Sequence, residues 1–567
     1  MVLIRHAATI DEGHELVADL CIVGAGAAGI TLALQFAGTG LRVLLLEGGE
    51  AEKLPAAQSL YAGTVDTPDL HSPPDRYRER RFGGTTTVWS GRCLPYDPID
   101  FDRRPWIADS GWPISYEDVA RHYPAAMELC EAGEFVFSGA AVKPGGMRPL
   151  IRSFTSRHFD TDPVERFSCP TNFGARYRHR LEASRNVDVI LGANVTELLT
   201  EGDGARVKSL VVRGLDGRRF TVAAQQVVLA TGGLEIPRLL LASRDRHAAG
   251  LGNQSGLVGR FYMCHIAGTI GDLRLDVDAG DVNAGYEQAD DGTYCRRRLA
   301  LTPEAQAEHG LANALMRLHF PAIPDPSHGS GPLSALYLAK PFVGHEHGKR
   351  LQNRGGEGMW LRHALNVARD PLATSAFLWR WLRYRTLAAR KFPSVIVPTR
   401  DNRFSLDFHG EQVPNRDSRV TLGGETDAFG MPRLAIAWRH SPTDIRTAEV
   451  ALDLFAGDLR RWGRGRLTYD RDAVAHHMLR DGAYGGHHIG TTRMSANPTG
   501  GVVDPQGRVH GVANLHIAGA SVFPTSSQAN PTLTVVAMAL GLAETLKRTF
   551  AARPHLDTAG LGQRDAA

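Results

Sequence analysis

Two stretches near the C-terminus carry side chains suited to proton transfer. Residues 486–494 read G-H-H-I-G-T-T-R-M, and residues 529–534 read A-N-P-T-L-T. A neutral imidazole, with an ordinary pKa near about 6.5, can take a proton at physiological pH. The amide of Asn530 can both donate and accept a hydrogen bond, so it can hold an oxygen atom on which charge develops. His487 or His488, together with Asn530, could therefore support removal of a proton from a bound hydroxyl group.

Metal binding is the alternative use of these histidines. His476 and His477 form another adjacent pair, and residues 345–347 read H-E-H. Adjacent residues of an extended segment point in opposite directions, and no carboxylate or cysteine follows the pairs at ligand spacing. The sequence therefore favours the interpretation without a metal site.

The N-terminal region has the pattern of a dinucleotide-binding unit. A short apolar strand at 19–23 runs into G-A-G-A-A-G at 24–29, and a segment of helical composition follows at 30–36. A second apolar strand at 41–46 ends at Glu47. Strand, G-x-G-x-x-G, helix, strand and acid in this order form the context that a dinucleotide site requires. The pattern by itself does not distinguish FAD from NAD.

Each part of this pattern has a physical role. Gly24 permits the tight turn, Gly26 lets a pyrophosphate approach the backbone, and Gly29 lets the helix pack closely on the strand. The unpaired N–H groups and the dipole at the start of the helix attract phosphate. Glu47, 18 residues after Gly29, can accept hydrogen bonds from ribose hydroxyls and would repel a 2′-phosphate.

Other segments indicate how the remaining chain is organised. Residues 81–90 contain two adjacent glycines before small hydroxyl residues, which suits a loop beside a flat ligand as well as an ordinary turn. Residues 205–230 alternate like a hairpin with its turn at Asp216 and Gly217. Residues 404–408, 420–422 and 434–438 alternate apolar and polar side chains, which predicts an antiparallel sheet with one wet face.

Two helices are predicted from their first residues. Ser115 with Asp118 forms a capping pair for a helix that should reach about Cys130. Ser441, the proline after it and Asp444 predict the start of a helix that should reach about Trp462.

The segment 373–391 is rich in Trp and Arg and has one aromatic face. That face contains Phe377, Trp381 and Tyr384. We favour a subunit or lid contact for it, with core packing and a surface for lipid headgroups as alternatives.

Composition excludes several classes of protein. Lys and Arg number 64 against 61 Asp and Glu, which indicates neither nucleic acid nor a strongly acidic partner. The six cysteines lie far apart, as is typical of free thiols in a reducing compartment. Residues 1–20 have no apolar leader region, and no run of about 18 apolar residues could span a membrane. We therefore expect a cytoplasmic globular protein without an integral membrane segment.

The C-terminal motifs, with N-L-H-I-A-G-A-S-V-F-P at 514–524 between them, resemble those of the glucose–methanol–choline (GMC) oxidoreductases. The resemblance extends over nearly the whole chain, since it includes the N-terminal glycine pattern, the glycine loop at 83–84 and the segments 230–240 and 412–420. The residues of these motifs are most similar to those of the sugar-oxidising branch, which comprises pyranose oxidase and its bacterial dehydrogenase relatives. That branch pairs a His with an Asn.

This resemblance implies roles for individual residues. His487 takes the position of the catalytic base, and Asn530 takes the second polar position beside it. Ser90 either hydrogen-bonds the flavin edge or caps a turn. The positions implied to bind FAD are Gly24, Gly26, Ala28, Gly29, Glu47, Gly83, Gly84, Thr87, Ser90, Val195, Ala230, Gly519, Ala520, Pro531 and Thr532.

Two positions depart from the family pattern. Val88 stands where pyranose oxidases carry a histidine bonded covalently to the flavin, so the resemblance implies a non-covalent FAD. Ile236 replaces the usual hydroxyl residue before the proline of the second signature, a change that we regard as minor.

The implied fold is α/β (α+β overall), with a Rossmann-type FAD-binding domain and a second, substrate-binding domain built on an antiparallel sheet. The first domain comprises 15–105, 170–265 and 471–550. The second comprises 106–169 and 266–470, with an insertion at about 325–395, and a tail follows at 551–567.

The implied activity is FAD-dependent oxidation of a secondary alcohol of a sugar, glycoside or related polyol to a ketone, with hydride transfer to flavin N5. Sugar as the substrate class depends on the branch resemblance alone. The alternatives are a non-sugar alcohol, or a flavoprotein of this fold with lyase or structural function. Oxygen or a quinone or dye would accept the electrons, and a homo-oligomer is possible.

Overall fold

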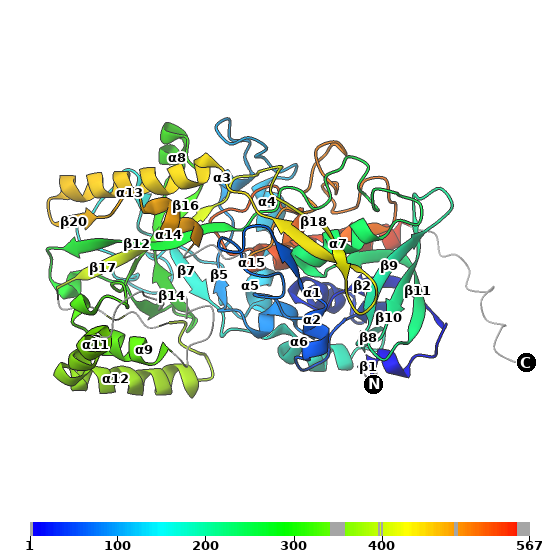
Figure 1. Ribbon diagram of the computed structural model, residues 1–567, viewed down its shortest axis with the longest axis horizontal. Helices are drawn as coiled ribbons and strands as arrows, with labels where there is room; N and C mark the ends of the chain where they lie inside the picture. The colour runs from blue at the N-terminus through cyan, green and yellow to red at the C-terminus, as the bar shows by residue number, and fades with distance from the viewer. Residues whose placement is uncertain (1–3, 341–357, 395–396, 398–400, 481–485, 553–567) are drawn as a thin grey trace, which may run out of the picture.

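The computed structural model describes residues 4–340, 358–394, 397, 401–480 and 486–552. Two β-sheet bodies lie side by side along the long axis of the molecule, one around β2 and β11 and the other around β12 and β17 (Figure 1). The H-E-H segment at 345–347 lies outside the described residues. The predicted tail at 551–567 also lies outside them, apart from its first two residues. The domain limits expected from the sequence stay a prediction.

The first body is built on an eight-stranded sheet with the order β1-β8-β3-β2-β11-β10-β9, and β21 also pairs with β11. The pairs from β1 to β11, and the pair of β11 with β21, are parallel, whereas β10 and β9 are antiparallel. The strands are β1 (Arg5–His6), β2 (Glu15–Val23), β3 (Val43–Leu46), β8 (Val187–Leu191), β9 (Asn194–Thr200), β10 (Val207–Arg213), β11 (Arg219–Leu229) and β21 (Leu515–Ile517).

The N-terminal pattern forms the elements that the sequence predicts. Strand β2 leads through the glycine turn into α1 (Ala27–Phe36), and β3 lies beside β2 in parallel register, with Val23 opposite Leu46. The hairpin is also confirmed, since β10 pairs with β11 in antiparallel register and Gly217 in the turn has φ +92°. Helices α6 (Phe173–Glu182), α7 (Gly232–Ala242) and α15 (Thr532–Ala551) complete this body.

The second body is built on a six-stranded sheet with the order β20-β12-β17-β16-β15-β6. Helices α13 (Pro442–Trp462) and α14 (Val474–Arg480) pack beside this sheet. The capping box of Ser441 with Asp444 and the last residue of α13 match the prediction. The strands are β6 (Phe159–Asp160), β12 (His265–Leu275), β15 (Leu299–Leu301), β16 (Ala314–His319), β17 (Arg403–Glu411) and β20 (Gly465–Thr468).

Strand β17 pairs antiparallel with β12 and β16, as expected, but the expectation that this sheet has one wet face is wrong for it. This strand is central, between β12 and β16, and it is buried on both faces over almost its whole length. Its alternate residues Ser405, Asp407 and His409 are polar, yet they are buried. The segments 420–422 and 434–438 belong instead to a three-stranded sheet of β18 (Arg419–Thr426), β19 (Pro432–Ala437) and β4 (Gly63–Val65).

The helix expected from Ser115 to about Cys130 is two helices. The capping box of Ser115 with Asp118 is present at the start of α4 (Tyr116–Ala120). A proline in the first turn of α5 (Tyr123–Leu129) separates the two, because proline cannot continue the preceding helix.

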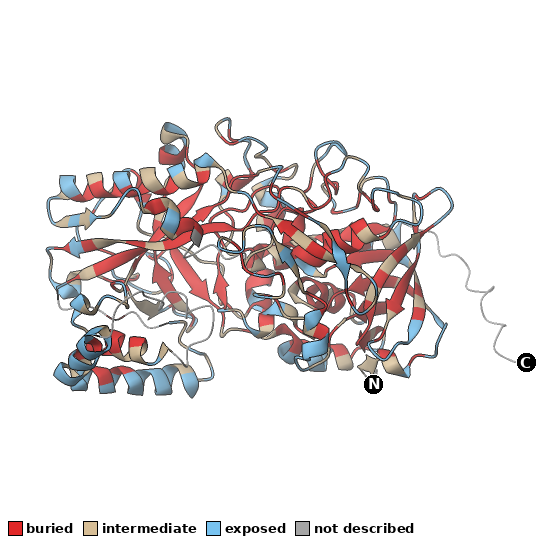
Figure 2. Ribbon diagram, viewed as in Figure 1, coloured by how far each residue is buried: buried red, intermediate tan, exposed pale blue. Residues whose placement is uncertain are grey.

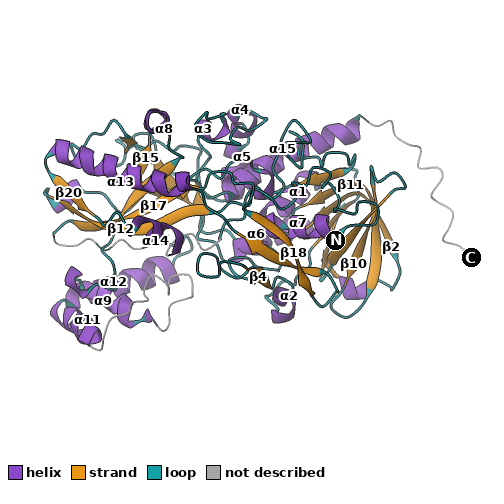
Figure 3. Ribbon diagram, turned by 45° about the horizontal axis from the view of Figure 1, so that its top comes forward, coloured by secondary structure: helices purple, strands orange, loops and turns teal. Residues whose placement is uncertain are grey.

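A helical layer projects from the second body, at the lower left of Figure 1. It consists of α9 (Gly331–Leu338), α11 (Gly358–Arg369), α12 (Pro371–Trp381) and the π-helix η7 (Leu382–Thr386). The predicted helix of 373–391 is therefore present but ends earlier than expected. Figure 3 shows the same layer separated from the large sheet in a second view.

The short elements complete the chain. They are η1 (Ala7–Thr9), α2 (Pro55–Ser59), η2 (Gly84–Thr87), β5 (Arg92–Cys93), α3 (Pro98–Phe101), β7 (Val164–Phe167), η3 (Ala279–Asp281), β13 (Tyr286–Gln288), β14 (Tyr294–Arg297), α8 (Pro303–His309), η4 (Pro326–His328) and η8 (Ala520–Val522).

Candidate active site

A long cavity begins at the carboxyl end of the parallel strands and continues to the two histidines of the C-terminal motif. Its lining includes Glu47 at the end of β3 as well as His487 and His488. In an open α/β sheet this is the edge at which ligands bind, outside the carboxyl ends of the strands. Of the residues expected to form the site, its lining includes Gly24, Gly26, Ala28, Glu47, Gly84, Val195, Ala230, His487, Gly519, Ala520, Pro531 and Thr532.

Five expected residues are not part of this lining. Gly29 packs inside the fold, Gly83 lies behind the loop, and Thr87 donates its hydroxyl hydrogen to the carbonyl of Gly84. Ser90 is exposed, and Asn530 is half-buried at the edge of the site. The cofactor roles of these residues stay predictions.

The glycines of the first turn differ in what surrounds them. A Cβ atom on Gly29 would lie 1.8 Å from the carbonyl oxygen of Gly24, so the contact of helix and strand excludes any side chain. A Cβ atom on Gly26 would meet no protein atom within 4 Å. Gly26 therefore borders space that a ligand can fill, whereas Gly29 serves the packing of the fold.

Glu47 fixes the end of β3 against the glycine turn. Its two carboxylate oxygens accept hydrogen bonds from the backbone N–H groups of Ala25 and Gly49, each at 2.9 Å. Burial raises the pKa of Glu47, while these two hydrogen bonds and the charge of Arg80 oppose the rise. The carboxylate keeps free lone pairs toward the cavity, where a ribose could donate to it.

A buried ion-pair network, which the sequence analysis missed, forms another wall of the cavity. Glu235 lies 2.9 Å from Arg78 and 3.2 Å from Arg238, and Arg238 lies 2.6 Å from Asp427. Burial opposes ionisation of Glu235, but Arg238, Arg78 and Arg80 outweigh it and lower the pKa of Glu235 to about 2. Glu235 and Arg238 are neighbours on α7, but Arg78 is 157 positions from Glu235 and Asp427 is 189 positions from Arg238, so no local pattern could reveal the whole network.

The candidate base His487 is hydrogen-bonded to a second histidine. Its Nδ1 lies 2.9 Å from Nδ1 of His265, at the start of β12, and Nε2 of His265 lies 3.1 Å from the carbonyl oxygen of Ala529. Burial, and then the positive charge of Arg92, lower the pKa of His487 to about 4. Burial, then His487 and Arg92, hold the pKa of His265 well below its usual value. Both imidazoles are therefore neutral at physiological pH.

A third histidine joins this cluster from β17. The ring of His409 lies 4.5 Å from that of His265, and its Nδ1 lies 2.7 Å from the carbonyl oxygen of Gln528. One nitrogen of each of the three histidines lies within 4.8 Å of the others, a spacing that a transition metal could also use. The direct contact between the two Nδ1 atoms nevertheless requires a shared proton, which favours a hydrogen-bonded chain over metal ligation.

His488 has different neighbours from His487. Its ring is roughly parallel to that of Tyr262, with ring centres 6.2 Å apart. Its backbone carbonyl would lie 2.1 Å from a Cβ atom on Gly233, so the glycine turn after β11 packs directly on this residue. The two adjacent histidines thus point toward different partners.

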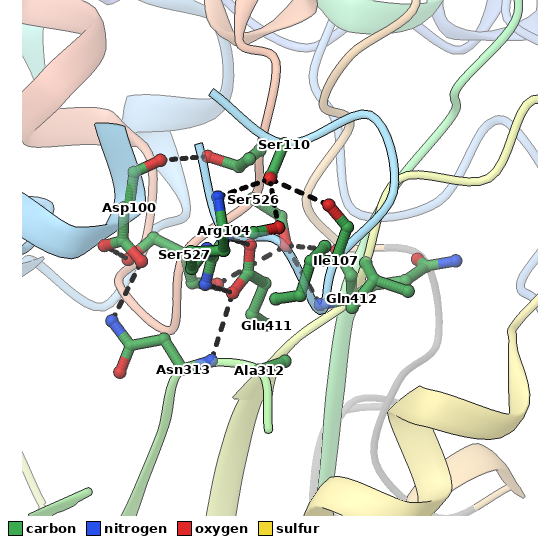
Figure 4. Close-up of polar contacts among 12 residues, drawn as sticks. Asp100, Arg104, Ile107, Ser110, Ala312, Asn313, Glu411, Gln412, Ser526 and Ser527 are labelled. Atoms are coloured by element: carbon green, nitrogen blue, oxygen red, sulfur yellow. Dashed lines mark hydrogen bonds and ion pairs between the residues drawn. The ribbon is translucent and has the colours of Figure 1, made fainter. Parts of the chain in front are cut away.

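The loop before Asn530 is anchored by polar contacts with Asp100 of α3 and with Gln412, just after β17 (Figure 4). Ser527 donates to a carboxylate oxygen of Asp100 at 2.6 Å, and Ser526 exchanges hydrogen bonds of 3.0 Å with the backbone of Gln412. Asp100 also accepts from the amide of Asn313 at 2.9 Å. Ser527 has φ +55°, which is strained for a residue with a side chain. These bonds hold the loop in a shape that it would not otherwise adopt.

A bidentate ion pair supports the same anchor. Both terminal nitrogens of Arg104 donate to Glu411, at 2.7 and 2.6 Å, and Glu411 also accepts from the backbone of Asn313. Arg104 and Glu411 are buried. Breaking such a pair leaves an unpaired charge inside the protein, which costs about 3–5 kcal/mol.

The chemistry of the cavity fits a flavin dinucleotide. Glycines that border open space lie at both ends of the path, Gly26 at the first turn and Gly519 after β21. Within the described part of the chain, the buried Oδ1 of Asn530 and Oγ1 of Thr231 have no hydrogen-bond partner. Buried polar atoms are normally satisfied, so these two are suited to a bound molecule.

Comparison with known proteins agrees with this chemistry. Residues 19–249 match the family model of the FAD dependent oxidoreductases, and residues 414–539 match that of the GMC oxidoreductases. The chain is 23% identical to 2-methyl-1,2-propanediol dehydrogenase of Mycolicibacterium austroafricanum, over 94% of this chain and 95% of that protein. It is 25% identical to 6'''-hydroxyparomomycin C oxidase of Streptomyces lividus, over 97% and 96%.

The fold is also that of a solved structure. Pyridoxine 4-oxidase from Mesorbium loti superposes with a TM-score of 0.52 at 18% identity, over 94% of this chain and 99% of that one. The expected Rossmann-type domain with an antiparallel second sheet is therefore confirmed. The matches to both family models and to the full-length relatives agree: the chain is an FAD-dependent, GMC-type oxidoreductase that acts on the CH–OH group of an alcohol.

Proposed function

We propose that this enzyme oxidises a secondary hydroxyl group of a sugar, glycoside or related polyol to a ketone, with His487 as the base. The observation that carries the proposal is the hydrogen bond between His487 and His265, because it leaves one defined nitrogen of His487 to act in the cavity. A neutral imidazole placed in this way takes the hydroxyl proton as the hydride leaves the carbon.

The hydrogen bonds determine which nitrogen this is. The carbonyl oxygen of Ala529 can only accept, so Nε2 of the neutral His265 carries the hydrogen and its Nδ1 has the lone pair. Nδ1 of His487 must then carry a hydrogen and donate it to His265. Nε2 of His487 is left with its lone pair free for the substrate. His265 is thus a positioning residue that selects the tautomer of the base.

Asn530 complements the base. Its Oδ1 is buried without a partner and can accept from a bound hydroxyl, its Nδ2–H group can donate to the alcohol oxygen while charge develops there, and the anchored loop keeps the amide in place. When bound, FAD supplies the two-electron acceptor for the hydride. The contribution of the chain is to orient the alcohol, remove its proton and keep the site shielded from water.

Two finer features of the proposal come from the sequence and the relatives. Val88 has no nucleophilic group and is exposed, which supports a non-covalent FAD. The name of the Streptomyces relative, an oxidase of an aminoglycoside, supports a sugar-like substrate, and the name of the diol dehydrogenase supports a polyol. Because the substrate named for the diol dehydrogenase is not a sugar, a non-sugar alcohol is the second candidate.

The test is an anaerobic screen of alcohols for bleaching of the flavin band, repeated with air and with a dye or quinone acceptor. We expect at least one hexose or hexoside to reduce the flavin faster than short primary alcohols do. Acid precipitation should release the yellow chromophore into the supernatant. The reverse order of rates would contradict the sugar proposal, and colour in the pellet would contradict non-covalent binding.

A further inference from the structure

Among the residues that the structure describes, those of the helical layer of α9, α11, α12 and η7 expose the most large apolar side chains. Fourteen large apolar side chains are exposed among the described residues, and ten of them lie between Trp360 and Leu387. Figure 2 shows the outer side of α12 as almost continuously exposed. Single exposed apolar residues are ordinary, but a concentration of this kind marks a surface that meets another apolar phase.

Helix α11 is amphipathic, but its polar side faces the protein and its apolar side faces outward. Its buried residues are polar: Nδ1 of His363 lies 3.0 Å from the hydroxyl of Ser334, and Asn366 donates to the carbonyl of Pro326 at 2.9 Å. Its outward residues Leu361 and Leu365, four positions apart and so on one face, are 65% and 43% exposed. The helix therefore packs on α9 through hydrogen bonds and presents its apolar face outward.

Helix α12 continues the same surface. Its inner face, with Phe377 and Trp381, lines a cavity of about 630 Å³. Leu372 and Trp379 are seven positions apart and therefore share one face of the helix. This face is turned away from the cavity, and the two side chains are 85% and 62% exposed. Leu387 beyond η7 is 72% exposed. We call the outward side of α11, α12 and η7 the outer apolar face.

The charge around this face identifies its partner. Residues 358–392 contain seven Arg and Lys side chains and one carboxylate, whereas the whole chain has a net charge of only +3. Arg362, Arg369, Arg380 and Arg383 are exposed beside the apolar residues. Leucine and tryptophan on one face with arginines around them is the composition of helices that lie in the interface of an anionic membrane.

A second copy of the chain fits this charge less well. A two-fold interface would bring the same basic surface against itself, and the like charges would oppose association. No helix in the described part of the chain has the length and apolar character that a membrane span requires. We propose that the outer apolar face docks the enzyme on the surface of an anionic lipid bilayer, with α11 and α12 lying in the plane of the headgroups.

The experiment is flotation of the FAD-loaded enzyme with vesicles of phosphatidylcholine alone and with vesicles that also contain phosphatidylglycerol. We expect binding to the anionic vesicles that weakens as the salt concentration rises. The double variant Leu372→Glu/Trp379→Glu should bind at least about tenfold more weakly, since it loses two apolar anchors and gains two negative charges. Its matched control is Leu54→Glu/Leu215→Glu, which changes the same net charge at two leucines that are exposed elsewhere.

A second variant separates the charge from the apolar contact. Arg369→Gln/Arg383→Gln should reduce binding to anionic vesicles by about fivefold for each arginine and leave binding to neutral vesicles unchanged. Flavin reduction by a soluble alcohol should be normal in both variants, which shows that they fold. No binding of the unaltered enzyme to anionic vesicles would overturn the proposal. An assembly that Leu372→Glu/Trp379→Glu splits into monomers, without any vesicle binding, would overturn it in favour of a subunit contact.

Discussion

The wall of the active site and the outer apolar face depart from ordinary burial in opposite directions. Along β17 and the loop before Asn530, polar side chains such as Asp407, His409 and Ser527 are buried, each in contact with a partner. Along α11 and α12, leucines and tryptophans are exposed. Burying a polar group costs free energy unless the group is hydrogen-bonded or paired, and apolar groups gain free energy by leaving water. The polar wall is therefore satisfied by its own partners, whereas the outer apolar face, as we propose, needs lipid to cover it.

The largest effect should come from His487→Ala. FAD should stay bound, because the glycine turn and Glu47, which we propose hold the dinucleotide, are unchanged, but anaerobic flavin reduction should slow by about 10²–10⁴-fold. His488→Ala is the matched control, since its ring packs beside Tyr262 and not against His265. Stopped-flow reduction compares the two. If His488→Ala were the slower enzyme, the assignment of the base would be wrong.

Removal of His265 should have the next largest effect. In His265→Ala, Nδ1 of His487 loses its acceptor, so the base can adopt the wrong tautomer, and the reduction rate should fall by roughly 10–100-fold, as for other groups that orient a reactive imidazole. The amide oxygen of Asn can accept in place of Nδ1, so His265→Asn should recover part of the rate. Equal rates for the two variants would indicate that His265 acts only through packing.

The pH dependence follows from the lowered pKa of His487. The neutral form takes the proton, so the rate should be constant above about pH 5 and should fall by about tenfold per pH unit below the pKa of about 4. The groups that face His487 are His265, His409 and Arg92. Since the charge of Arg92 contributes to the low pKa, Arg92→Gln should move the inflection upward. An inflection near about 6.5 in the unaltered enzyme would contradict the assigned environment.

The anchor of the Asn530 loop offers a smaller effect. Ser527→Ala removes the donor to Asp100 and the acceptor for the backbone N–H of Ala529. Leaving Asp100 with one donor fewer should lower the free energy of unfolding by about 1–3 kcal/mol. Looser placement of Asn530 should also slow reduction several-fold. Thermal unfolding and stopped-flow reduction measure the two effects, and Ser110→Ala, a hydroxyl beside Arg104 that does not contact the loop, is the control.

The sequence predicted the local elements better than the site. The glycine turn, the hairpin at Asp216, and helix α13 with its capping box depend on neighbouring residues, and the structure confirms them. The two-residue alternation of β17 is visible in the sequence, but it does not predict that the polar face is buried, because period alone does not distinguish solvent from a buried polar wall. The contact of His265 with His487 joins residues 222 positions apart, and the pair of Arg78 with Glu235 joins residues 157 positions apart, so no spacing rule connects them.

The smallest effect should come from the outer apolar face itself. Leu372 is 85% exposed, so Leu372→Ser should change the free energy of unfolding by no more than about 0.5 kcal/mol, as is usual for a surface position. Leu406→Ser on β17 is the matched comparison. That leucine is 0% exposed between β12 and β16, so the same change should cost several kcal/mol, from the lost burial and the unpaired hydroxyl together. Denaturant unfolding in the absence of lipid measures both variants. A cost at Leu372 close to that at Leu406 would show that this leucine is packed in the free enzyme, and the outer face would then need no partner.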